Sequence, residues 1–143
     1  MNYLDYETIK RRYERSCMQV VEILEEQDQL FLQTQPHGIS YGDKVKTTSH
    51  TNPIESYIIA REQRHIDERL REAKAISKEW ENLLDEKEQE LRKSKDIVDI
   101  IYCLRFIDRQ RVRRIHQRVH YSESQIYRRL EKIRRNIDEL FEI

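Results

Sequence analysis

The sequence contains few of the residues that interrupt helices or build metal and disulfide sites. Its 143 residues include two glycines, two prolines and two cysteines, against 38% charged and 37% hydrophobic residues. That balance suits long, exposed helices better than a compact globule. Cys17 and Cys103 stand alone in separate helical segments and have no metal-ligand spacing, so we expect reduced thiols in a cytoplasmic protein.

Other absences narrow the function. No apolar run approaches the roughly 18–20 residues of a membrane span, and the N-terminus has no signal-peptide core, so no membrane partner is expected. The chain has no Gly-rich phosphate loop and no paired Cys–His unit, which argues against an enzyme. His116 and His120 have helical spacing but no third ligand, and His37 and His50 lack a cysteine partner, so we expect no metal or other cofactor.

Charge is distributed unevenly along the chain, although the formal net charge is zero. Residues 105–135 contain 11 Lys and Arg against 3 Asp and Glu, whereas residues 1–104 contain 16 against 21. A basic block of this density between acidic ends is typical of a nucleic-acid-binding site. The alternative is a solvated helix face, which charge runs more often represent.

The first part of the chain, residues 1–34, is expected to form an amphipathic packing helix over residues 2–34. Residues 35–53 hold both glycines and both prolines and are expected to form a linker or an ordered loop. Asn52 and Pro53 then start the next helix, because proline suits the first helical turn. The predicted apolar row of the first helix is Tyr6, Ile9, Tyr13, Cys17, Val20, Leu24 and Phe31, widened by Val21, Ile23 and Leu30.

Residues 54–95 are predicted to form one long helix with sustained heptads, as in a coiled coil or a long bundle helix. Charges of opposite sign alternate over its remaining positions and favour pairing between residues four apart. This helix pairs with residues 2–34 or with another subunit, and the sequence does not separate the two. The heptad positions are Ile59, Ile66, Ala73 and Trp80, alternating with Leu70, Leu84 and Leu91.

The C-terminal third, residues 96–143, contains three apolar segments. Residues 96–107 are apolar on several sides and are predicted to form a buried central helix. A short second helix follows, for which Asp108 is the expected N-cap. Residues 120–122 then have the length of the tight turn in a helix-turn-helix. The apolar face of the second helix consists of Val112, Ile115 and Val119.

The last helix has the sharpest local signal. Ser122 and Gln125 form a capping box, in which each side chain bonds the backbone N–H of the other residue. A turn of about 100° per residue places Ser124, Arg128 and Arg135 opposite the apolar row. Arginine can bond guanine bidentately, glutamine can bond adenine, and further cations neutralise phosphates. The apolar row is Ile126, Leu130, Ile133, Ile137 and Leu140.

The helix pair departs from the usual helix-turn-helix pattern at two positions. His120 lies in the turn where glycine is usual, and His116 lies where a small residue normally lets the helices approach. Two basic amphipathic helices joined by a short turn also occur in helical proteins that bind no nucleic acid.

The order of these parts resembles the ArpU/RinA-type regulators of phages and prophages. The similarity is carried by KVKTTSHTNPIES at 44–56, the long charged helix, LRFID at 104–108 and SESQIYRRL at 122–130. This resemblance implies a late-gene transcriptional regulator with a sigma-factor region-four-like helix-turn-helix, acting in the cytoplasm of a bacterial host cell. Double-stranded DNA is the implied partner, and RNA polymerase is a further candidate.

The same resemblance assigns roles to side chains of the last two helices. Ser124, Tyr127 and Arg128 would face bases, with Gln125 as a further contact. Phosphates would be held by Arg113, Arg129, Lys132 and Arg135.

Two functions remain open from the sequence. The first is a sequence-specific DNA-binding regulator that works as a homo-oligomer. The second is a coiled-coil structural or assembly protein, for example a DNA-packaging protein similar to small terminase subunits. For both we predict an all-α chain in which long antiparallel or coiled-coil helices precede a C-terminal helix-turn-helix unit.

Overall fold

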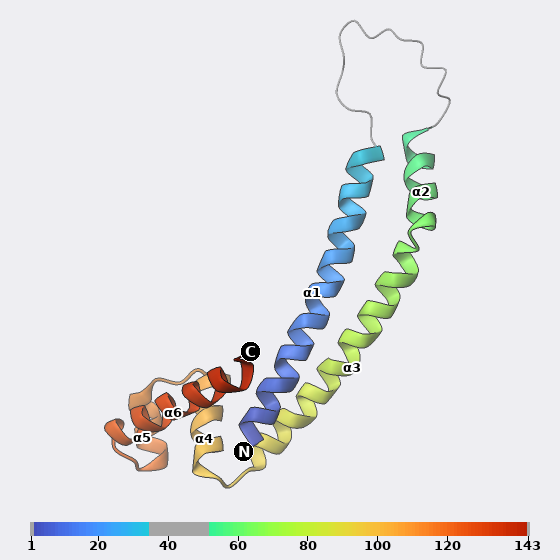
Figure 1. Cartoon of the computed structure of the whole chain (residues 1–143). Coiled ribbons are helices and arrows are strands. Elements are labelled where there is room, and N and C mark those ends of the chain that lie inside the picture. The colour runs from blue at the N-terminus through green and yellow to red at the C-terminus, as the bar shows by residue number, and fades with distance from the viewer. Residues whose placement is uncertain (1, 35–51, 143) are drawn as a thin grey trace, which may run out of the picture. The chain divides into compact units, whose positions relative to one another are not determined.

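The computed structural model describes residues 2–34 and 52–142, which form six α-helices and one π-helical turn and contain no strand. The all-α prediction is confirmed. Helix α1 (Asn2–Thr34) matches its predicted bounds and runs antiparallel to α3 (Ile66–Lys93) (Figure 1). Most of the predicted linker, with His37 and His50, lies outside the described residues. In the two described ranges, no helix is both long and apolar enough to cross a membrane.

The described residues divide into two compact units. One unit contains Arg15–Lys78, and the other contains the residues up to Glu14 together with those from Glu79 onward. The second of these units therefore includes more of the chain than the predicted C-terminal unit of residues 96–143.

In the unit Arg15–Lys78, the later part of α1 packs against α2 (Pro53–Gln63) and the start of α3. Among the described residues of this unit, the fully or nearly buried apolar side chains are few, namely Leu30, Ile66 and Ala73. The Arg69 guanidinium donates two hydrogen bonds to the Glu26 carboxylate, at 3.1 and 2.8 Å. These bonds lower the pKa of Glu26. The heptad side of α3 therefore packs within the chain.

The start of α2 agrees with the sequence. The side chain of Asn52 accepts a hydrogen bond from the Ile54 N–H at 3.0 Å, and Pro53 occupies the first helical turn. This pair confirms the predicted start of the helix, because proline lacks the N–H that would otherwise be unsatisfied there.

The prediction of one continuous helix over residues 54–95 is wrong. The helix breaks at Arg64 and His65, and His65 has a positive φ of 54°. The break changes which side of α2 faces α1: Ile59 is 51% exposed, whereas Ile66, seven residues later, is fully buried. Tyr57 takes the inward position and accepts a 3.0 Å hydrogen bond from Gln27. Local geometry at His65 thus overrides the heptad register.

Near the C-terminal end of α1, the buried apolar row also differs from the predicted one. Leu24 and Phe31 were expected in the row, yet they are 40% and 45% exposed. Leu30, expected only to widen the row, is the buried residue there. Because the helix breaks at Arg64 and His65, the side of α2 that carries Tyr57 contacts α1. The Tyr57 ring meets the Phe31 ring edge-on, with 5.2 Å between the ring centroids.

The second unit is built around α4 (Ile97–Tyr102) and the π-helical turn η1 (Cys103–Ile107). Together they form the predicted buried central segment. The Tyr102 ring stacks on Tyr3 at 5.3 Å and meets Tyr6 edge-on at 6.0 Å. The start of α1 therefore completes this core. The buried core residues are Tyr3, Tyr6, Leu91, Ile101, Tyr102, Cys103, Leu104, Val112, Ile115, Ile126, Leu130 and Ile133.

Two polar contacts join α1 to α4 inside this unit. Asp99 is 1% exposed, and its carboxylate accepts hydrogen bonds from the Tyr3 backbone N–H at 3.2 Å and the Ser94 hydroxyl at 2.7 Å. Asp99 thereby caps the first turn of α1, where backbone N–H groups lack helical partners. The Tyr102 hydroxyl donates to Glu7. Burial, together with the Glu7 carboxylate, raises the pKa of Tyr102.

Replacing Asp99 tests this cap. Asp99→Ala leaves the Tyr3 N–H and the Ser94 hydroxyl without their acceptor, so it should lower the free energy of unfolding by about 1–3 kcal/mol. Chemical denaturation followed by circular dichroism measures the change. The exposed Asp85 of α3 provides the control, and Asp85→Ala should stay within about 0.5 kcal/mol of wild type. Equal stability of the two variants would contradict the cap.

Candidate nucleic-acid interface

Helices α5 (Val112–Val119) and α6 (Glu123–Phe141) pack together in the second unit (Figure 1). Val112 and Ile115 of α5 are buried, as predicted. The first three positions of the predicted α6 row are also buried, whereas Ile137 is half-buried and Leu140 is 43% exposed. The buried positions of α6 are Ile126, Leu130 and Ile133. This row fixes the rotation of α6 and so determines which side chains face solvent.

The predicted capping box is present at the start of α6. The Gln125 N–H donates to the Ser122 hydroxyl at 3.2 Å, and the Ser122 N–H donates to the Gln125 side-chain carbonyl at 3.0 Å. Two backbone groups at the helix start are thus satisfied by side chains only three residues apart. The first turn of α6 is therefore fixed by local bonds.

Both histidines that depart from the usual pattern have a role in the turn. His120 takes the left-handed conformation, with φ 60° and ψ 24°, that glycine usually supplies after a helix. Its N–H donates to the His116 carbonyl at 3.1 Å. The His116 Nδ1–H donates to the Tyr121 carbonyl. His116 is exposed, so it holds the turn without separating the two helices.

The prediction that Asp108 caps the short helix is wrong. Helix α5 begins after Arg111, whose side chain makes no capping hydrogen bond. The π-helical turn carries the preceding helix to Ile107, and Arg109 then reverses the chain with a φ of 53°. Asp108 instead accepts hydrogen bonds from the Arg92 guanidinium at 2.9 and 3.4 Å.

Six of the predicted contact residues lie exposed on α6: Ser124, Gln125, Tyr127, Arg128, Lys132 and Arg135. Tyr127 is 59% exposed, an unusual position for a large aromatic side chain on a helix with an available buried face. Exposed arginine, hydroxyl and aromatic groups within the first two turns form a surface that can donate to and stack on another molecule.

Three of the predicted contact residues on α6 already have partners within the chain. Gln125 uses its carbonyl oxygen in the capping box, which leaves its amide NH₂ available. The Arg129 guanidinium lies 5.2 Å from the Tyr121 ring centroid and steadies the turn. Arg135 pairs with Glu131 at 3.7 Å, and both side chains are well exposed, so this pair contributes little to stability.

Arg113 of α5 lies in an open hollow between the starts of α5 and α6. The hollow also contains Arg105 and Arg111, two residues that the sequence interpretation did not assign to the site. Arg105 donates to the Gln110 carbonyl at 3.0 Å and so holds the loop before α5. The signal for these two residues was the basic block alone, since neither lies on a helix face that periodicity defines. Glu123 and Tyr127 complete the hollow on the α6 side.

Among the described residues, no group of three or more His, Cys, Asp or Glu side chains is placed to hold a metal ion. No family model, no curated protein and no solved structure matches the chain.

The capping box gives the first prediction for this surface. Ser122→Ala removes the side-chain acceptor for the Gln125 N–H and should cost about 0.5–2 kcal/mol of stability. Hydrogen exchange should show the loss mainly in the first turn of α6. Ser124→Ala, a neighbouring exposed serine, is the matched control and should leave that exchange unchanged. Protection in the Ser122 variant equal to wild type would mean that α6 does not start there.

The turn gives a second prediction, with the opposite sign. A non-glycine residue in the left-handed region costs about 1–2 kcal/mol, whereas glycine costs about 0.5–1 kcal/mol more in chain entropy. His120→Gly should therefore raise the free energy of unfolding by up to about 1 kcal/mol. His116→Ala should lower it, because the Tyr121 carbonyl loses its donor. A destabilised His120→Gly variant would contradict the left-handed turn.

Proposed function

We propose that the chain is a sequence-specific DNA-binding regulator in which α5 and α6 form a helix-turn-helix and α6 is the recognition helix. The observation that carries the proposal is the orientation of α6. Its buried row and its capping box fix one face inward, while Ser124, Tyr127 and Arg128 lie exposed on its first two turns. A helix held in this way can present the same side chains at every encounter with a binding site.

The chemistry of the exposed side chains suits the major groove. The groove admits one α-helix, and an arginine near the start of a recognition helix can bond the O6 and N7 atoms of guanine. In this proposal Arg128 reads a base pair, and Ser124 and Tyr127 contact neighbouring base edges. Lys132, two turns into α6, and Arg113 on α5 contact phosphates. The surplus of positive charge over residues 105–135 supplies the attraction to DNA.

The resemblance to ArpU/RinA-type regulators supports the biological setting. It favours control of phage or prophage genes in the cytoplasm of a bacterial host, with RNA polymerase as a candidate partner. The proposed regulator binds as a homo-oligomer, because helix-turn-helix proteins commonly place two copies on two half-sites. Since the heptads of α3 pack within the chain, the subunits meet through other surfaces.

A second candidate function, an assembly or DNA-packaging protein, is favoured by one observation. Helix α2 buries none of its residues, and Ile54, Ile58 and Ile59 are all exposed. Exposed isoleucines on a short helix are typical of a surface that associates with another protein. This candidate differs from the first in sequence preference, since a packaging or scaffold protein needs no preferred DNA site.

Selection from random duplex DNA, followed by affinity measurements at two salt concentrations, tests the proposed function. A regulator should prefer its selected site over bulk DNA by at least about 10³-fold. Binding without preference, or no binding, would reject the regulator and leave the assembly protein in front.

The recognition helix gives a prediction that separates base recognition from phosphate binding. Arg128→Ala should cost about 1–3 kcal/mol on the preferred site and flatten the preference at one base pair. Lys132→Ala should weaken binding to all duplexes alike and lower the log–log salt slope by about one unit, because one fewer counterion is released. Fluorescence anisotropy with variant duplexes measures both. If neither substitution changes the affinity for DNA, the DNA-binding site lies elsewhere.

A further inference from the structure

The loop before α5 forms a second concave surface that the proposed reading of bases does not use. Four arginines surround it, and Asp108 is its one acidic side chain. The surface, which we call the loop hollow, is lined by Asp108, Arg109, Gln110, Arg111, Arg113, Arg114 and Gln117.

The positive charges of the loop hollow are not paired with acidic side chains within the part of the chain that the structure describes. There, no carboxylate pairs with Arg109, Arg111, Arg113 or Arg114. Asp108, by contrast, is bound from the α3 side by Arg92, which also donates to Glu88 at 3.0 Å. The hydrogen bonds that Arg92 donates to these two carboxylates, Asp108 first, raise the pKa of Arg92. The acid that would oppose an anion in the hollow is therefore already neutralised.

The backbone around the loop hollow is held in place by hydrogen bonds. Arg109 has a positive φ, and the Gln110 N–H donates to the Leu104 carbonyl at 2.9 Å. Arg105 holds the Gln110 carbonyl from the other side. Because the backbone that carries these arginines is already ordered before a ligand binds, less conformational entropy is lost on binding.

The loop hollow is continuous with the proposed reading surface. Arg111 and Arg113 line both the loop hollow and the hollow between α5 and α6. The latter ends at Glu123 and Tyr127, on the first turns of α6. If a DNA duplex presents its base edges to α6, the sugar–phosphate backbone beside those bases would therefore lie against the loop arginines.

We propose that the loop hollow binds phosphodiester groups of the DNA strand that borders the groove read by α6, and that Arg92 is a positioning residue that keeps Asp108 away from those phosphates. This inference rests on the proposed function. A planar guanidinium matches phosphate oxygens with two parallel hydrogen bonds, and the hollow offers several such groups. The assignment adds Arg109, Arg111 and Arg114 to the proposed interface.

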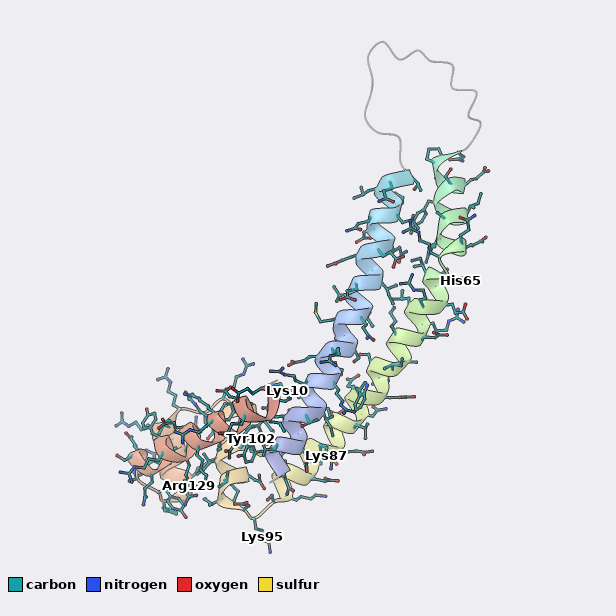
Figure 2. The ribbon with its side chains drawn as sticks, in the orientation of Figure 1. Lys10, His65, Lys87, Lys95, Tyr102 and Arg129 are labelled. Atoms are coloured by element: carbon teal, nitrogen blue, oxygen red, sulfur yellow. The ribbon has the colours of Figure 1, made fainter. Side chains whose placement is uncertain are left out.

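The first test removes the loop charges in the full-length protein. Arg109→Ala and Arg114→Ala should each weaken binding to the preferred and to an unrelated duplex by the same factor. Each should lower the log–log salt slope by about one unit. Lys95→Ala is the matched control, since this exposed lysine lies between α3 and α4 (Figure 2) and does not line the loop hollow. It should leave affinity and slope unchanged.

The second test uses Arg92 and Asp108 together. Arg92→Ala should weaken DNA binding, because it releases an uncompensated carboxylate beside the phosphates. Adding Asp108→Asn to this variant should restore the affinity, whereas a purely structural role of Arg92 would give no such rescue. Thermal melting of each variant separates lost folding from lost binding.

The outcomes distinguish this inference from the proposed function. Preferred binding that is unaffected by Arg109→Ala and Arg114→Ala would overturn the loop hollow and leave the reading by α6 intact. An absence of rescue by Asp108→Asn would overturn the role of Arg92. No DNA binding by the wild-type protein would overturn both proposals, and capture of an acidic peptide instead would assign the basic surface to a protein partner.

Discussion

The buried carboxylate of Asp99 joins the beginning of the chain to its C-terminal part. It accepts from the Tyr3 backbone and from Ser94, so one side chain organises the start of α1, the end of α3 and the first turn of α4. A buried carboxylate is costly unless hydrogen bonds replace its hydration. Those bonds exist only when the three segments are together. Asp99 therefore makes the arrangement of this unit cooperative, since loss of any one segment leaves an uncompensated group.

The proposed DNA surface depends on this arrangement through a second contact. Asn136, in the second half of α6, donates to the Tyr3 hydroxyl at 2.9 Å, and the Tyr3 ring stacks on Tyr102. The Arg11 guanidinium lies 3.9 Å from the Phe141 ring centroid, further along α6. The outer face of α6 is thus oriented from behind by residues of α1. A recognition surface held on packed helices varies less in position than one held on loops.

The sequence predicted the features that depend on residues close together in the chain. The capping box of Ser122 and Gln125, the start at Asn52 and Pro53 and the buried faces of α5 and α6 follow from spacing alone. The sequence did not predict the roles of Asp99 and Asp108, because their partners lie 96 and 16 residues away. Both acids looked like solvated or capping residues. The break at His65 was also missed, since neither glycine nor proline marks it and the heptad spacing continues across it.

The participation of Tyr3 in the core has a consequence for the order of events during synthesis on the ribosome. Tyr3 cannot reach its native position until Asn136, 133 residues later, has been made. At about 5–20 residues per second this delay is about 7 to 27 s. The hairpin of α1 and α3 is complete earlier, while the aromatic side chains at the start of α1 still lack their partners. A nascent chain therefore passes through a stage with exposed tyrosines, and the proposed DNA-binding surface forms only as α6 emerges.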